Sequence, residues 1–228
     1  SLQLPSGAVN HIFMGDDNKV VLVAWCDQEV TERISLGDSI KQIDVWGKQR
    51  ELKRHGQDVE LPIGRMPTFF VDLHPEITQF RMALHFTKTQ VPSVFSVPHE
   101  NSLKGKNFFR QGIEVKASLY IPPLVGEGGR FGGKSNEHWD ITPRQLQTTV
   151  AAGHPFEIPF RFLLKDAAYD LQPIRVDFRI EADRTYEFSV WRDIRVGMGE
   201  IDIKVKSRLD ESGNLVVEQR MVNHDPTP

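Results

Sequence analysis

The sequence predicts an all-β protein made of two consecutive antiparallel β-sandwich domains. Apolar and polar residues alternate with a period of two along many short segments, turn residues separate these segments, and a proline-containing stretch divides them into two sets. Successive side chains of a strand point to opposite faces, so each alternating segment has one face for a core and one for water. This pattern is typical of antiparallel sheets that are covered on one side.

The first set contains five strand candidates with turn signals between several of them. The candidates are residues 20–26, 29–36, 40–46, 59–63 and 68–73. A turn at 15–18 precedes the first candidate, and a turn at 54–58 precedes the fourth. Both turns contain glycine with Asp or Asn nearby, and these residues tolerate the left-handed backbone that tight hairpins need.

The second set shows the clearest alternation in the sequence. Its runs are 113–121, 156–162, 175–181 and 201–206, and a turn at 210–214 joins 201–209 to 215–222. We expect these runs to bury their apolar faces against one another in a second sandwich. Only two short stretches, 143–150 and 165–170, are moderately helical in composition.

The boundary between the domains is predicted near residues 89–101. Pro92 and Pro98 lie in this stretch, and proline interrupts strand pairing and stiffens a linker. We therefore expect domains at 1–90 and 91–228. The second domain contains an irregular glycine-rich loop at 122–142, and a long loop in a compact β-domain is often functional or mobile.

Composition narrows the classes of partner. The chain has 228 residues, with 28 basic against 31 acidic side chains, which gives no electrostatic reason to expect nucleic acid. No apolar run is long enough to span a membrane and no signal peptide is visible, so we expect a soluble chain without a membrane partner. Cys26 is the single cysteine, and its apolar surroundings predict a thiol that packs as a small hydrophobe.

Each half of the sequence resembles an accessory β-domain. The first half resembles the small β-sandwich that follows the catalytic barrel in many bacterial glycoside hydrolases. The matching residues are the strand 20–25 ending in tryptophan, a strand closing on Gly37, and the segments 44–47, 59–63 and 66–71. The second half is similar to immunoglobulin-like accessory domains of large secreted bacterial proteins, through residues 154–160, 176–186 and 213–219.

This resemblance implies a non-catalytic accessory region of a larger extracellular or cell-surface protein that acts on polysaccharides. The implied partners are catalytic or other domains of the parent protein. Two alternatives stay open. One is a carbohydrate-binding module that contacts polysaccharide through exposed aromatic side chains. The other is a protein-interaction or surface-assembly module that recruits a partner through an open sheet edge.

No catalytic residue is expected, although carboxylate pairs of the kind that glycosidases use do occur. Glu181 with Asp183, and Asp16 with Asp17, are interpreted as edge, turn or salt-bridge residues, and Arg184 is expected to pair with its neighbour Asp183. The arginines of this half alternate with acidic residues, which predicts a mixed face rather than a basic one. These arginines are Arg175, Arg179, Arg184, Arg192 and Arg195.

Neither a cofactor nor a metal is expected. The histidines have no metal-ligand spacing, although calcium at the acidic turn 16–18 stays an alternative because Ca²⁺ favours several oxygen ligands. The glycine-rich run 126–134 fails the phosphate-loop pattern, since no Ser or Thr follows a Gly-Lys pair at the required spacing.

The tryptophans are the remaining candidates for ligand contact. Trp25, Trp46 and Trp191 lie in strand patterns and are interpreted as core or sheet-face residues. Trp139 lies in the irregular loop, with Phe131 and His138 near it in sequence. These last three residues form a ligand-binding candidate if Trp139 is exposed, and the alternative is that Trp139 packs against the second sandwich.

Overall fold

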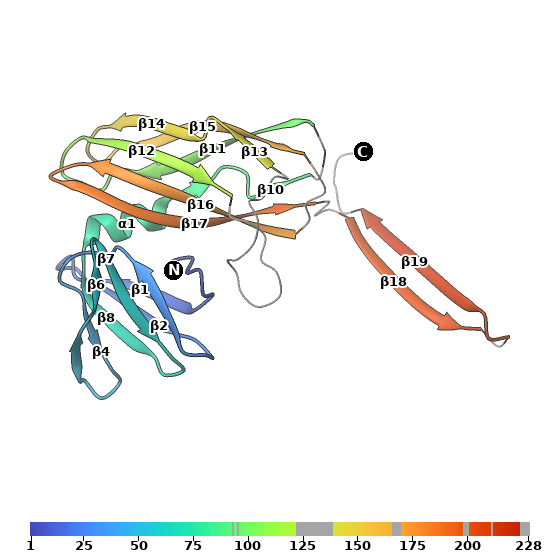
Figure 1. The fold of residues 1–228 in the computed structure, drawn as a ribbon, viewed down its shortest axis with the longest axis horizontal. Coiled ribbons are helices and arrows are strands. Elements are labelled where there is room, and N and C mark those ends of the chain that lie inside the picture. Colours follow the sequence, from blue (N-terminus) through green and yellow to red (C-terminus); the bar gives the residue numbers. More distant parts are fainter. Residues whose placement is uncertain are drawn as a thin grey trace.

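A computed structural model describes residues 1–92, 94, 96–121, 139–165, 170–197, 201–210 and 212–223. The described chain forms two β-sandwiches that lie one above the other, with a hairpin that extends away from both (Figure 1). Every strand pair is antiparallel except a short pair between residues 90–91 and 195–196. The predicted all-β class with two consecutive sandwiches is therefore confirmed.

The N-terminal sandwich consists of a five-stranded and a three-stranded sheet. Its strands are β1 (Val9–Met14), β2 (Val20–Trp25), β3 (Val30–Ile34), β4 (Lys41–Ile43), β5 (Gln49–Glu51), β6 (Arg54–His55), β7 (Asp58–Ile63) and β8 (Thr68–Leu73). The sheet orders are β1-β2-β8-β4-β5 and β3-β7-β6. Leu22, Leu61 and Phe70 are completely buried between the two sheets, in a core that extends from Leu2 to Leu73.

The C-terminal sandwich consists of a five-stranded and a four-stranded sheet. Its strands are β9 (His85–Phe86), β10 (Gln90–Val91), β11 (Pro98–Lys106), β12 (Ile113–Tyr120), β13 (Trp139–Thr142), β14 (Gln145–Val150), β15 (Pro155–Leu164), β16 (Asp170–Glu181) and β17 (Thr185–Val196). The sheet orders are β10-β17-β16-β12-β14 and β13-β15-β11-β9. As the alternation predicted, Val115, Phe162 and Ile180 point inward and are completely buried.

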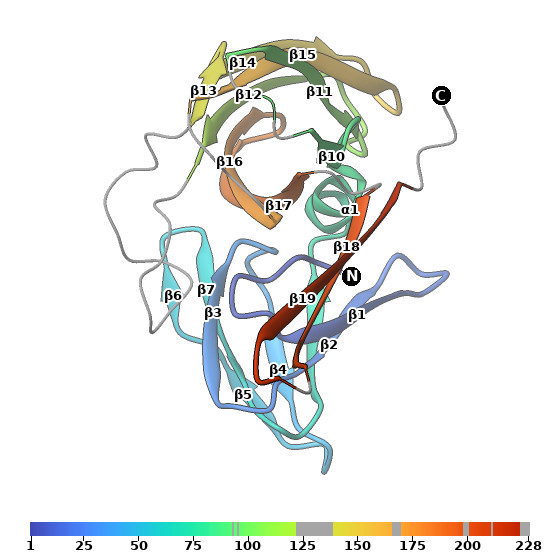
Figure 2. The same cartoon turned by 90° about the vertical axis from the view of Figure 1, so that its right-hand side faces the viewer.

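A helix that the sequence did not predict, α1 (Pro75–Ala83), connects the sandwiches. It begins with proline at its first turn and has Glu76 in that turn and Arg81 in its last turn, all favourable placements. Figure 2 shows α1 beside β17, above the N-terminal sandwich. Ile77 and Phe80 already belong to the C-terminal core. The two cores therefore divide between Leu73 and Ile77, whereas the boundary expected at 90/91 falls within the C-terminal sandwich.

The stretch 143–150, interpreted as moderately helical, is a strand. Residues 145–150 form β14, which pairs with β12 along its whole length. Its apolar Leu146 and Val150 are buried, because pairing on an existing sheet outweighs a weak local helical preference. In the second stretch, residues 166–169 lie outside the described residues, and Asp170 begins β16.

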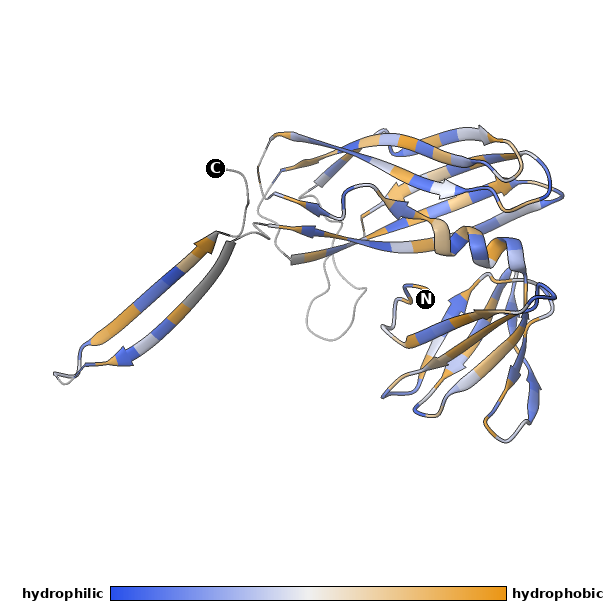
Figure 3. Cartoon of the chain, turned by 180° about the vertical axis from the view of Figure 1, so that it is seen from behind, coloured by the Kyte–Doolittle hydropathy of each residue, from blue (hydrophilic) through white to orange (hydrophobic). Residues whose placement is uncertain are grey.

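The final hairpin differs from the expected arrangement. β18 (Ile201–Leu209) pairs only with β19 (Leu215–Asn223) and extends away from the sandwiches (Figures 1 and 3). Leu209, Leu215 and Val217 of its apolar face are exposed. The expectation that all alternating runs bury one another was wrong here, since alternation fixes which residues share a face but not what covers it. Among the described residues, no helix is both long and apolar enough to cross a membrane.

Candidate interaction surfaces

Of the three residues proposed as a ligand site, the structure describes only Trp139, and this residue is buried. Trp139, at the start of β13, is 3% exposed, and its ring centroid lies 5.3 Å from that of Phe162 in the C-terminal core. Phe131 and His138 lie outside the described residues. Trp139 therefore takes the packed position, and its ring faces are not open for stacking on a ligand.

The candidate carboxylate pairs have structural partners. Glu181 accepts hydrogen bonds from the Thr185 hydroxyl and from Arg179 Nε, which lower the pKa of Glu181 below its ordinary value. Asp183 accepts a hydrogen bond of 3.1 Å from the Tyr186 hydroxyl. The expected ion pair between Asp183 and Arg184 is wrong, because Arg184 reaches across to Asp38 of the N-terminal sandwich.

The acidic turn at 16–18 is held by a neighbouring lysine. Lys19 Nζ lies 2.6 Å from Asp17 Oδ2, and this hydrogen bond lowers the pKa of Asp17. In the part of the chain that the structure describes, no three His, Cys, Asp or Glu side chains come together as metal ligands. Cys26 packs partly buried against the N-terminal core, as its surroundings predicted.

The five-stranded sheet of the N-terminal sandwich has apolar side chains on both faces. One face fills the core, and the other, which we call the apolar outer face, points away from it. This outer face consists of Val9, Phe13, Val21, Val23, Trp25, Ile43, Phe69 and Val71. Val9 is 48% exposed and Phe13 is 59% exposed, and the other six side chains are partly exposed. The face therefore presents a largely apolar surface, and the polar residues that share it are His11 of β1 and Lys41 of β4.

Trp46 projects from the tip of the β4–β5 hairpin. It is 80% exposed, so its interpretation as a core or sheet-face residue was wrong. The turn is ordered by Asp44, whose Oδ1 accepts hydrogen bonds from the backbone N–H groups of Trp46 (3.0 Å) and Lys48 (2.9 Å). Gly47 completes the turn with a φ of 82°, in the left-handed region. A short local turn thus ended the strand before the tryptophan.

The two sandwiches meet at the free edge of β17. Gln57, in the turn between β6 and β7, donates to the Thr185 carbonyl at 3.1 Å and accepts from the Glu187 N–H at 3.0 Å. The side-chain amide thus pairs with β17 as a neighbouring strand would. Further along the same edge, the Arg195 N–H donates to the Thr89 carbonyl at 2.8 Å. These contacts close an edge at which a foreign strand would otherwise pair.

Two arginines, the buried Arg81 and the half-buried Arg192, fasten α1 to this edge. Arg81 is 6% exposed, and its guanidinium donates to the Ser189 carbonyl at 2.7 Å and to the Ser35 carbonyl of the N-terminal sandwich at 3.4 Å. Arg192 Nε donates to the Leu84 carbonyl at the C-terminal end of α1 at 2.6 Å. Burial lowers the pKa of Arg81 to about 9 and that of Arg192 to about 10. The guanidinium of Arg81 thereby joins both sandwiches.

A polar cluster completes the junction. The Tyr186 hydroxyl lies 3.3 Å from His74 Nε2, and the Arg184 guanidinium lies over the Tyr186 ring at 4.7 Å from its centroid. The His74 N–H donates to the Leu36 carbonyl at 2.7 Å. Gly37 has a φ of 129°, and a Cβ there would lie 2.9 Å from the backbone nitrogen of His74. The chain therefore passes too closely at Gly37 for any larger residue.

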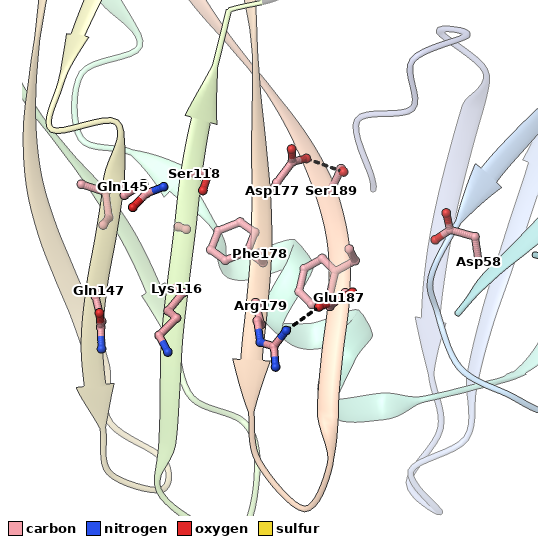
Figure 4. Close-up of a pocket in the computed structure, with 13 residues that line it drawn as sticks. Asp58, Lys116, Ser118, Gln145, Gln147, Asp177, Phe178, Arg179, Glu187 and Ser189 are labelled. Atoms are coloured by element: carbon pink, nitrogen blue, oxygen red, sulfur yellow. Dashed lines mark hydrogen bonds and ion pairs between the residues drawn. The ribbon is translucent and has the colours of Figure 1, made fainter. Parts of the chain in front are cut away.

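A polar groove of about 760 Å³ lies between the sandwiches, on the outer face of β14, β12, β16 and β17 (Figure 4). Two rows of side chains run across these four strands and form its floor. The first row is Gln147, Lys116, Arg179 and Glu187, and the second is Gln145, Ser118, Asp177 and Ser189. Asp58 of β7 stands on the opposite side of the groove (Figure 4). The predicted mixed face of acids and arginines is therefore present here.

No family model matches the chain. Among curated proteins, it is 27% identical over 164 residues to protein transport protein SEC31 of Pyricularia oryzae. This match covers 66% of the chain but only 12% of that relative, so the chain spans far less than two thirds of the protein it matches.

Among solved structures, the chain is similar to the PapD-like domain 7 of human CEP192. That match has a TM-score of 0.31 and 10% identity and covers 50% of this chain and 84% of that one. The CsuC–CsuE chaperone–tip adhesion complex of Acinetobacter baumannii matches with a TM-score of 0.31 and 9% identity, over 60% of this chain and 76% of that one. Salmonella α2-macroglobulin mutant Y1175G matches with a TM-score of 0.28 and 13% identity, over 98% of this chain and 18% of that one.

Proposed function

We propose that the chain is a non-catalytic accessory module that packs against another domain of a larger protein through its apolar outer face. The observation that supports this most directly is the unbroken apolar character of β2, from Val20 to Trp25. An antiparallel sheet with one face in water alternates apolar and polar residues, whereas continuous apolar strands are typical of sheets covered on both faces. At β2, the outer face therefore has the composition of a buried surface.

The size of this face favours a folded domain as the partner over a short peptide that would contact only a few of its side chains. Eight apolar side chains lie together across β1, β2, β8 and β4, and burial of apolar surface contributes roughly 25 cal/mol per Å². Contiguous apolar patches on monomeric proteins commonly mark interaction sites. At the edge of the face, the His11 ring stacks on Trp25 with centroids 5.6 Å apart, which supplies a polar rim.

The junction between the sandwiches supports a bracing role. Arg81 and Gln57 join the two units through backbone groups of Ser35, Ser189 and β17, which restricts their relative movement. A module whose two sandwiches are fixed in this way would hold its partner domain at a constant position relative to the rest of the chain. A flexible tether would need neither a buried guanidinium nor a closed sheet edge.

The nature of the larger protein rests on the sequence resemblance. Segments 20–25 and 59–71 resemble the sandwich beside glycoside-hydrolase barrels, and we infer a polysaccharide-active parent at the cell surface or outside the cell. The candidate carboxylates Glu181 and Asp183 are engaged by Arg179, Thr185 and Tyr186, which supports structural roles for them. We accordingly expect the isolated chain to hydrolyse no glycoside in a broad substrate panel. Turnover that is lost in Glu181→Gln would contradict this.

Oxidative footprinting of the parent protein tests the docking proposal. Hydroxyl radicals should label Phe13 and Trp25 strongly in the isolated chain and several-fold more weakly in the full-length protein, because the neighbouring domain covers them. Met82, which is exposed on α1, serves as the control and should react equally in both. Equal labelling of Phe13 and Trp25 in the two samples would overturn the proposal.

A further inference from the structure

The polar groove has the features of a binding site that is separate from the apolar outer face. Its floor belongs to the C-terminal sandwich and presents hydroxyl, amide, carboxylate and cationic groups from four strands (Figure 4). Phe178 and Phe188 line it only from below, because both side chains are buried in the core. A ligand in this groove therefore meets hydrogen-bonding groups rather than an apolar floor.

The charges on the floor of the groove are already paired with neighbouring side chains, whereas Asp58 on the opposite side has no ion pair among the described residues. Arg175 Nε lies 2.6 Å from Asp177 Oδ1, which also accepts from the Ser189 hydroxyl at 2.6 Å. Arg179 lies 2.8 Å from Glu181 and 3.0 Å from Glu187.

Lys116 is paired in the same way, because its Nζ lies 3.2 Å from Glu114 Oε1. A polyanion needs cations whose charge is not compensated in this way, so the groove is suited to a neutral ligand.

Two aromatic side chains border the groove in the next row of the same sheet face. Arg175 of β16 lies opposite Tyr120 of β12 on one side and opposite Trp191 of β17 on the other. Tyr120 is 47% exposed, and Trp191 is partly exposed. The two aromatic residues are separated by two strand spacings, or about 10 Å. Sugar rings stack their apolar faces on aromatic rings, and their hydroxyls both donate and accept hydrogen bonds.

We propose that this groove binds a neutral oligosaccharide. Tyr120 supplies a stacking platform at one end, and Ser118, Gln145 and the paired side chains of the floor rows hydrogen-bond to the sugar hydroxyls. The Gln145 amide can donate and accept at once, so it matches two adjacent sugar hydroxyls. The proposal goes beyond docking of the outer face and does not depend on it, because the two surfaces share no residue.

Calorimetric titration of the chain tests this proposal. The probes are cellohexaose, xylohexaose, mannohexaose and laminarihexaose, with polygalacturonate and heparin as anionic comparisons. We expect at least one neutral hexasaccharide to bind and the polyanions not to bind. Tyr120→Ala should raise the Kd by about tenfold through loss of stacking, while Tyr120→Phe should leave it nearly unchanged.

Two further variants test whether the effect on the Kd is specific to the groove. Gln145→Ala, at an exposed position, should also weaken binding, and Trp46→Ala is the matched control for an exposed aromatic side chain on the other sandwich. Binding of no neutral hexasaccharide at millimolar concentration would overturn the proposal. Preference for a polyanion, or a Kd that Tyr120→Ala and Gln145→Ala leave unchanged, would overturn it as well. None of these outcomes changes the labelling of Phe13 and Trp25 by hydroxyl radicals that the docking proposal expects.

Discussion

Gln57 and Thr185 are separated by 128 residues, yet the amide of Gln57 donates to the Thr185 carbonyl at 3.1 Å. The same amide accepts from the N–H of Glu187, so one side chain satisfies two successive backbone groups of β17. The N-terminal sandwich thereby occupies the place of a missing strand. An alternative raised by the sequence, recruitment of a partner by an open sheet edge, therefore has no opening at this part of β17.

The first prediction concerns this amide. Gln57→Ala should weaken the junction by about 1–2 kcal/mol, because two hydrogen bonds are lost and two backbone groups become unpaired. Hydrogen exchange should accelerate at the Glu187 amide, while the cores exchange as before. Gln49→Ala, an exposed glutamine on β5, is the control. Unchanged protection of Glu187 in the Gln57 variant would show that the contact does not hold the junction.

The second prediction uses two glycines with left-handed backbone. Gly37→Ala should lower the free energy of unfolding by more than about 2 kcal/mol, since its Cβ would meet the backbone of His74. Gly56→Ala should cost only about 1 kcal/mol, because its φ is 63° but nothing lies within 4 Å of the added Cβ. Thermal unfolding of both variants gives the comparison. Equal losses would mean that the approach of Gly37 to His74 does not matter.

The third prediction concerns acid sensitivity. Hydrogen bonds from Thr185 and Arg179 lower the folded-state pKa of Glu181 below its ordinary value of 4.5. The unfolded chain therefore takes up this proton at a higher pH than the folded chain. The stabilisation of the folded state by the ionised Glu181 is present above pH 4.5 and is lost as the pH falls through the folded-state pKa.

Glu181→Gln should accordingly show a smaller fall in Tm than the unaltered chain when the pH drops from about 5 to about 3. Glu51→Gln changes an exposed carboxylate with no hydrogen-bond or ion-pair partner among the described residues, and should leave the acid response unchanged. Parallel Tm profiles for the unaltered chain and Glu181→Gln would contradict the assignment.

The fourth prediction concerns the apolar outer face. Replacing Val9 by Thr and Phe13 by Ser should reduce binding of an apolar fluorescent dye to the isolated chain. Both side chains are largely exposed, so the free energy of unfolding should change by less than about 1 kcal/mol. Val97→Thr, at an exposed apolar position before β11, should leave dye fluorescence unchanged. Undiminished fluorescence of the double variant would show that the dye, and by extension a partner, binds elsewhere.

The fifth prediction concerns the β18–β19 hairpin. An isolated two-stranded ribbon is at most marginally stable in water, and its apolar residues Leu209 and Val217 are exposed. Backbone amides of residues 205–209 and 215–222 should therefore exchange with solvent much faster than those of β12 and β16. Hydrogen exchange followed by mass spectrometry measures both sets in one experiment. Equal protection would indicate that the hairpin is covered in solution.

The alternation of apolar and polar residues predicted the strands well, because a strand that buries one face has an apolar residue at every second position. The runs 113–121 and 156–162 became β12 and most of β15, with inward residues in the predicted phase. Helix α1 gave no such signal. It is short, and both its buried arginine and its buried phenylalanine are explained only by the sandwiches on either side.

The candidate surfaces were less predictable, and for different reasons. The apolar outer face is indicated by the sequence of β2. Its six residues are all apolar, whereas a half-buried strand needs an apolar residue only at every second position. The junction is not indicated by any local sequence pattern, because Gln57 and Arg81 each bind a partner more than 100 residues away in the chain. The groove likewise depends on register between four strands, which brings Tyr120, Arg175 and Trp191 into one row.

The route by which the chain leaves the C-terminal sandwich has a mechanical consequence. The β18–β19 arm is the next element of the chain after β17, the strand that α1, Gln57 and β10 hold along its outer edge. A force that acts along the axis of β17 would load its many lateral hydrogen bonds together, in shear, instead of breaking them one at a time. The hairpin is thus joined in sequence to a strand that is held along both of its edges.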